Sequence, residues 1–161
     1  MILRAQSVGL PIALVPGVLV VMNIVYAMAA YPAGVLSDQI NRRSVLIVGL
    51  LFLVAADIAL AFASRIAEVG LGVILWGLHM GLTQGLLATL VADTAPVELR
   101  GTAYGVFNLL TGIALLAAGI IAGALWDVIG PKGTFLAGAA FTVVGIAGLL
   151  VVRRRMNEHA A

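Results

Sequence analysis

The sequence predicts an all-α membrane protein with five transmembrane helices. Its residues are 63% hydrophobic and only 10% charged, and their mean hydropathy is +1.17. A soluble domain needs a polar surface around its core, so this composition excludes that class. The apolar residues form uncharged runs that mostly reach the roughly 20 residues of a membrane-crossing helix. They do not alternate with polar residues as the strands of a membrane β-barrel do.

The uncharged runs divide a single membrane domain, residues 1–161, into spans and short connections. The predicted spans are 9–36, 44–64, 69–93, 101–126 and 133–152. The second span counts as one helix although Asp57 interrupts it, because the apolar character continues through residues 58–64. Between and after the spans lie two predicted loops, 37–43 and 94–100, and a tail, 153–161.

Basic residues predict how the chain is oriented. Six lie at the first, third and fifth junctions, namely Arg42, Arg43, Arg100, Arg153, Arg154 and Arg155, and three lie at the other ends, namely Arg4, Arg65 and Lys132. Because loops rich in Lys and Arg are retained in the cytoplasm, we expect both loops and the tail there and the N-terminus outside. Helical spans favour the inner (plasma) membrane. The odd number of spans suggests the hypothesis that an upstream part is missing and that residues 1–4 end an earlier helix.

The loop between the first two spans carries a recognisable motif. Gly34, Leu36, Asp38, Arg42 and Arg43 form the pattern G-x-L-x-D-x-x-x-R-R, which resembles motif A of the major facilitator superfamily. A glycine near a helix end allows close helix approach, an aspartate can accept hydrogen bonds from a helix start, and arginines anchor a chain in headgroups. We therefore expect a conformational latch, which alternating access requires. The alternative is that the two arginines only set topology.

Two positions depart from the family pattern. Gln39 stands where a basic residue is common, which predicts a weaker latch network. Asn41 stands where Gly is common. Asparagine tolerates the left-handed turn that such a glycine adopts, so we expect the loop to keep its fold.

A second loop supports the resemblance. Asp93, Pro96, Glu98, Arg100 and Gly101 belong to a stretch that is similar to the P-x-x-x-R-G-T loop of the same superfamily. We expect Asp93, Glu98 and Arg100 to pair with the first loop. Together the two loops imply the eighth to twelfth helices of a twelve-helix transporter, with the first seven absent, and neither loop identifies a substrate.

Polar residues inside the spans are candidates for a substrate pathway because they cost free energy in lipid. The candidates are Asn23, Tyr26, His79, Thr83, Gln84, Asn108 and Thr111. The alternative is that such residues only form hydrogen bonds between helices. Two of the titratable groups, His79 and Asp57, are also candidate proton sites, since an imidazole titrates near neutral pH and a carboxyl deep in a span needs a reason.

Glycines recur at every fourth residue in two spans. Gly77, Gly81 and Gly85 share one face of the third span, and Gly119 and Gly123 share one in the fourth. Small residues at this spacing let helix backbones touch, so we expect packing seams at both sets, the first of them either a packing or a sliding seam. The alternative is that glycine is simply common here, at 19 of 161 residues.

No pattern in the sequence indicates an enzyme, a cofactor, a metal site or a nucleic-acid partner. The predicted function is that of the C-terminal portion of a secondary active transporter, which moves a small solute, with or without a coupling proton, across the lipid bilayer by alternating access. The alternative is a truncated, non-transporting remnant, or a half-transporter subunit that requires a separate N-terminal partner, because the substrate site in this architecture lies between two halves.

Overall fold

The computed structural model describes residues 1–158, with side chains through Val151. All regular secondary structure in this part is helical, as the composition predicts. Its elements are α1 (Ile2–Ser7), η1 (Ile12–Leu14), α2 (Val15–Gln39), α3 (Arg42–Phe62), α4 (Ile66–Thr94), η2 (Val97–Leu99) and α5 (Arg100–Glu158). Four described segments are long and apolar enough to cross a membrane: Ile12–Gln39, Arg42–Phe62, Ile66–Thr94 and Val97–Val151. The all-α membrane fold class is thereby confirmed.

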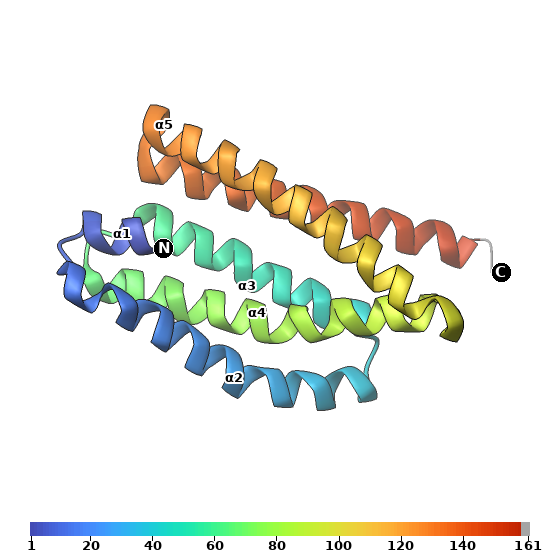
Figure 1. Ribbon diagram of the computed structural model, residues 1–161. Helices are drawn as coiled ribbons and strands as arrows, with labels where there is room; N and C mark the ends of the chain where they lie inside the picture. Colours follow the sequence, from blue (N-terminus) through green and yellow to red (C-terminus); the bar gives the residue numbers. More distant parts are fainter. Residues whose placement is uncertain (159–161) are drawn as a thin grey trace.

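The long helix α5 reverses direction at Gly130. This residue has φ +75° and ψ −175°, a conformation that only glycine adopts without strain. Pro131 follows it, and its fixed φ suits the first turn of a new helix. The two arms, 100–129 and 131–158, therefore run back along each other (Figure 1). They contain the fourth and fifth predicted spans.

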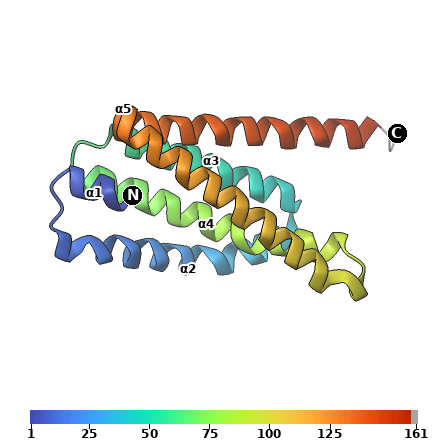
Figure 2. The ribbon, with the colours of Figure 1, turned by 45° about the horizontal axis from the view of Figure 1, so that its top comes forward.

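The connections between helices alternate between the two ends of the bundle. The α2–α3 turn and the segment 95–99 lie at one end, on the right of Figure 1. The α3–α4 turn and the α5 reversal lie at the other end, near α1 (Figures 1 and 2). The two loops that contain Arg42, Arg43 and Arg100 thus share one end of the molecule, which is the arrangement expected from the charge count.

Helix α4 occupies the centre of the bundle, packed against α2 on one side and α3 on the other, and α3 packs in turn against α5. The buried core lies toward the α1 end and includes Ala5, Leu60, Val73 and Phe135. The ring of Phe135 also meets the Trp126 ring edge-on, with centroids 6.3 Å apart, and so joins the two arms of α5.

Asn41 caps the start of helix α3. Its side-chain Oδ1 accepts a hydrogen bond from the Arg43 N–H at 2.9 Å, with φ −58° and ψ 118°. The expected left-handed turn at Asn41 and the expected helix-capping role of Asp38 are therefore both wrong. The reason is that α2 continues to Gln39, so Asp38 lies inside the last turn of α2 and only Ile40 and Asn41 connect the helices.

Removing this cap should destabilise the protein measurably. We expect Asn41→Ala to lower the free energy of unfolding by about 1 kcal/mol, because an N–H group at the helix start loses its acceptor, and Asn41→Asp to preserve it. Unfolding in mixed micelles, followed by circular dichroism, measures both. Asn23→Ala is the matched control, since the Asn23 side chain donates to the Leu19 carbonyl of its own helix and to no other described residue. Equal effects at Asn41 and Asn23 would contradict the capping role.

Candidate functional site

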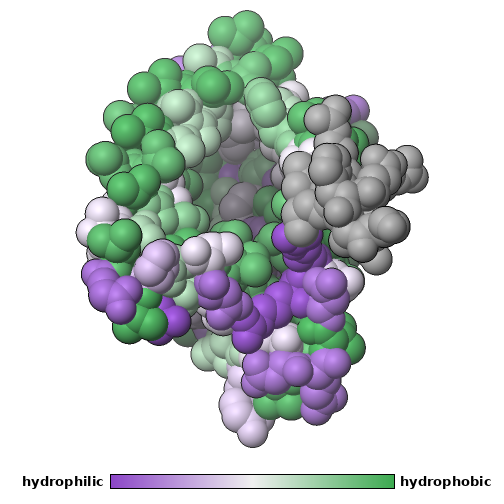
Figure 3. Space-filling model, turned by 90° about the vertical axis from the view of Figure 1, so that its right-hand side faces the viewer, coloured by the Kyte–Doolittle hydropathy of each residue, from purple (hydrophilic) through white to green (hydrophobic). Residues whose placement is uncertain are grey.

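Arg42 connects three helices at the end that carries both predicted loops. From the first turn of α3, its Nη1 pairs with Asp93 Oδ2 near the end of α4. Its Nη2 lies 4.0 Å from Asp38 Oδ1 in the last turn of α2. Hydrophilic side chains gather on this face of the molecule (Figure 3). We call Asp38, Arg42 and Asp93 the charged latch.

The charges of this latch are poorly placed for their own helices. Arg42 lies at a helix N-terminus, and Asp38 and Asp93 lie near helix C-termini, and each arrangement opposes the helix macrodipole. The side chains of Asp38, Arg42 and Asp93 are 76%, 31% and 51% exposed. Exposed ion pairs contribute about 0–1 kcal/mol. The latch is therefore a weak contact that depends on the mutual position of three helices.

The other motif residues of the first loop have different surroundings. Gly34 is exposed, and a Cβ added there would meet no described residue within 4 Å, so the expected close helix approach is not seen at this glycine. Leu36 is 42% exposed. Arg43 is half-buried beside the Asn41 cap. Within this motif, the contact between helices is made by the charged residues.

The second predicted loop contributes one residue to the latch. Pro96 follows the end of α4, and Arg100 starts α5, as predicted. Asp93 pairs with Arg42. Glu98, Arg100 and Gly101 are exposed, and the described residues show no ion pair from either Glu98 or Arg100 to the first loop.

Two of the repeated glycines mark the closest approach of α2 to α4. A Cβ at Gly77 would lie 2.8 Å from the Met22 carbonyl oxygen, and one at Gly81 would lie 2.6 Å from the Ala29 Cβ. A Cβ at Gly85, Gly119 or Gly123 would meet nothing within 4 Å among the described residues. The predicted packing seam is thus seen at the first two positions and not at the other three.

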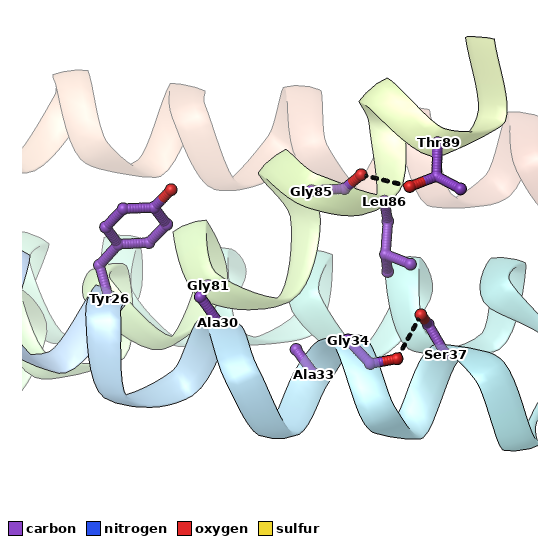
Figure 4. Close-up of a pocket in the computed structure, with 9 residues that line it drawn as sticks. All are labelled: Tyr26, Ala30, Ala33, Gly34, Ser37, Gly81, Gly85, Leu86 and Thr89. Carbon is purple, nitrogen blue, oxygen red and sulfur yellow. Dashed lines mark hydrogen bonds between the residues drawn. The ribbon is translucent and has the colours of Figure 1, made fainter. Parts of the chain in front are cut away.

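A cavity of about 180 Å³ lies between α2 and α4 beside this crossing (Figure 4). It brings together Tyr26, a pathway candidate, and Gly34 of the motif with Gly81 and Gly85 of the glycine repeat. Two further lining residues turn their hydroxyls back onto their own helices: Ser37 donates to the Gly34 carbonyl at 2.7 Å and Thr89 to the Gly85 carbonyl at 2.9 Å. Each hydroxyl oxygen keeps the capacity to accept a hydrogen bond from a solute.

The remaining pathway candidates do not share one face. Asn23, Gln84, Asn108 and Thr111 are exposed. His79 and Thr83, which the sequence groups with Gln84, instead contact α3. The His79 Nδ1 lies 2.9 Å from the Gly49 carbonyl oxygen, and because a carbonyl only accepts, this nitrogen carries the proton. The Thr83 methyl group packs over Gly49, where an added Cβ would lie 2.6 Å from it.

The hydrogen bond from His79 should have a small but measurable effect. We expect His79→Leu to lower the free energy of unfolding by about 0.6 kcal/mol, the typical value for a hydrogen bond between membrane helices. We expect His79→Gln to lose less, since an amide can still donate to Gly49. Unfolding in mixed micelles measures this, with Gln84→Leu on the exposed face as the control. A loss in the control as large as that of His79→Leu would show that the Gly49 contact contributes nothing.

One charged residue has a contact that the sequence did not reveal. Arg4 on α1 donates from Nε to the Leu60 carbonyl at 2.9 Å and from Nη2 to the Ala63 carbonyl at 2.6 Å. It thereby satisfies carbonyl groups at the end of α3, as a basic residue at a helix C-terminus does. No local pattern could predict this contact because the partners are more than fifty residues apart.

The fold defines a multi-pass helical membrane protein. The chain belongs to the major facilitator superfamily, whose family model matches residues 2–161. It is 36% identical to an uncharacterized MFS-type transporter of Methanocaldococcus jannaschii, over 94% of this chain and 39% of that protein. It is 32% identical to the class B tetracycline resistance protein of Escherichia coli, over 69% of this chain and 27% of that protein.

A glucose transporter, GlcP of Staphylococcus epidermidis, is 29% identical over 64% of this chain and 23% of its own length. No solved structure gives a significant match. The chain therefore spans about two fifths or less of the length of these curated relatives.

Proposed function

We propose that this chain is the C-terminal portion of a secondary active transporter that moves a small solute by alternating access. The observation that carries the proposal is the placement of Arg42, which contacts carboxylates on α2 and α4 from the start of α3. Such a contact between three helices can exist in one conformation and break in another. A residue that served only to set topology would need no partner on α4.

The packing of α2 on α4 supports this mechanism. The two backbones touch at Gly77 and Gly81, and the latch holds their ends further along, beside Asp38 and Asp93. Opening of the latch would let the helix ends separate while the glycine contact serves as the pivot. The cavity at Tyr26 lies on the same helix pair, and we propose that it belongs to the solute pathway together with the exposed Asn23, Gln84, Asn108 and Thr111.

We further propose that the latch end faces the cytoplasm of an inner-membrane protein, with the N-terminus outside, because the basic loops share this end. A proton is the proposed coupling ion, and His79 and Asp57 are its candidate carriers in the transport cycle. The bond between His79 and Gly49 favours a structural role for the histidine.

The second candidate function is a non-transporting remnant or a half-transporter subunit. The first arm of α5 favours the subunit, because its large apolar residues are mostly exposed, including Leu109 at 64% and Leu115 at 68%. An exposed apolar surface of this kind can be covered by lipid or by a second protein surface. A separate N-terminal half would provide such a surface.

Reconstitution into vesicles distinguishes these functions. The chain is tested alone and together with the part of the Methanocaldococcus relative that it does not match. Uptake of tetracycline and of glucose is measured first, because the names of two other relatives contain these solutes. Uptake that requires both proteins identifies this chain as a half-transporter. Loss of that uptake when the chain carries Arg42→Asp supports the latch. A folded chain that forms no complex and no active pair would be a remnant.

A further inference from the structure

The carboxyl group of Asp57 is buried away from the latch and the cavity. Asp57 is only 3% exposed and lies in the part of α3 that faces the second arm of α5. A Cβ added at Gly138 would stand 2.8 Å from Asp57 Oδ2 and 3.4 Å from Cγ. The backbone of the α5 arm at Gly138 therefore lies directly against the carboxyl group, and a larger residue at position 138 would require the Asp57 side chain to move.

This carboxyl group has no direct hydrogen-bond or ion-pair partner for a negative charge among the described residues, and the Met1 amino group acts on it only from beyond ion-pair distance. An ionised carboxylate removed from water without donors is strongly disfavoured, whereas the protonated group is neutral and fits against an apolar backbone. The contact with Gly138 is thus compatible with the protonated form.

The charged groups near Asp57 form no direct contact with its carboxyl group among the described residues, and most of them bind other partners. From α1, the Met1 amino group acts on it electrostatically without forming an ion pair, and Arg4 donates to the carbonyls of Leu60, Ala61 and Ala63. From α5, the Lys132 ammonium lies 4.5 Å from the centre of the Phe62 ring. From α4, Glu68 bonds the N–H groups of Ser64 and Arg65, and His79 bonds Gly49.

We propose that Asp57 is a proton-binding site that controls the packing of α3 against the second arm of α5. The carboxylate takes a proton from water through its small exposed edge, becomes a neutral carboxyl group and allows the arm to close at Gly138. Loss of the proton to water restores the charge, and the arm must then separate to hydrate it. This switch deepens the proposed role of Asp57 as a proton carrier and rests on that part of the proposed function, but its packing step is measured at the α3–α5 contact without transport.

Infrared difference spectroscopy of the whole chain in lipid nanodiscs tests the protonation. We expect a protonated-carboxyl band that disappears in Asp57→Asn and remains in Asp127→Asn, whose carboxyl is exposed on the first arm of α5. An added N-terminal extension moves the terminal amine away and should leave the band in place. Absence of a band that depends on Asp57 throughout the pH range of the folded protein would overturn the proposal.

The packing is measured separately, because the chain contains no cysteine and accepts paired spin labels cleanly. Suitable positions are Leu51 on α3 and Phe141 on α5, which are 53% and 67% exposed. We expect the distance between the labels to increase as the pH rises through the loss of the Asp57 band, and to stay constant in Asp57→Asn. A wild-type distance that does not change while the band disappears would overturn the control of packing.

Discussion

One methyl group at Gly81 is expected to destabilise the protein by about 1–3 kcal/mol, the usual range for overpacking a tight contact. The added Cβ in Gly81→Ala would lie 2.6 Å from the Ala29 Cβ and 3.1 Å from the Tyr26 carbonyl oxygen. These neighbours belong to the Ala29 side chain and the α2 backbone, so relief requires α2 to move as a whole. Gly77→Ala should behave in the same way, since its Cβ would lie 2.8 Å from the Met22 carbonyl oxygen.

Gly85 provides the matched control one turn further along α4. Among the described residues, a Cβ there meets nothing within 4 Å. We therefore expect Gly85→Ala to raise the free energy of unfolding by the roughly 0.5–1 kcal/mol by which alanine is favoured over glycine inside a helix. Gly81→Ala and Gly85→Ala make the same chemical change, but we expect the first to lower the free energy of unfolding and the second to raise it. Unfolding of each variant in mixed micelles measures the difference. If Gly81→Ala were as stable as Gly85→Ala, the α2–α4 crossing would not be closely packed.

The helices were predictable because lipid imposes them. A backbone that crosses a bilayer must satisfy its own hydrogen bonds, so apolar runs of sufficient length become helices whatever their tertiary neighbours. The ends were less predictable. Helix α2 continues to Gln39, and the two arms of α5 meet at Gly130 and Pro131 with almost no loop. Local geometry at a single glycine decides such a boundary, and hydropathy does not detect it.

The charged latch was partly predictable for a similar reason. The spacing of Asp38 and Arg42 placed them at one helix junction, and the pairing with Asp93 was expected from the second loop. The caps were not predictable, because a shift of one turn at the end of α2 moved Asp38 into the helix and left Asn41 to start α3. The glycine repeats showed which face of a helix carries small residues, but they did not show which helix packs against that face. Isolated glycines such as Gly49 and Gly138 therefore escaped notice although both lie in close contacts.

Exchanging the charges of the latch should stabilise the protein and impair its function. In the double variant Arg42→Asp with Asp93→Arg, the ion pair is kept, but an acidic residue now starts α3 and a basic residue ends α4. Each charge then interacts favourably with the macrodipole of its own helix, which contributes about 0.3–1 kcal/mol to the free energy of unfolding at each terminus. Repulsion between the new carboxylate and Asp38 offsets a few tenths of a kcal/mol of this gain. We expect the exchanged variant to unfold at a higher temperature than the wild type.

The single variants complete the cycle. Arg42→Asp and Asp93→Arg each leave like charges facing one another, and the coupling energy between the two positions should be about 0.2–1 kcal/mol, as for other exposed pairs. A latch must open during each transport cycle, so the exchanged pair should slow uptake by the reconstituted transporter while it raises stability. If Arg42 were only a topology determinant, the exchange would alter insertion without any coupling to Asp93. Higher stability together with slower uptake therefore separates a latch from an anchor, because an anchor gives no reason for the two quantities to move in opposite directions.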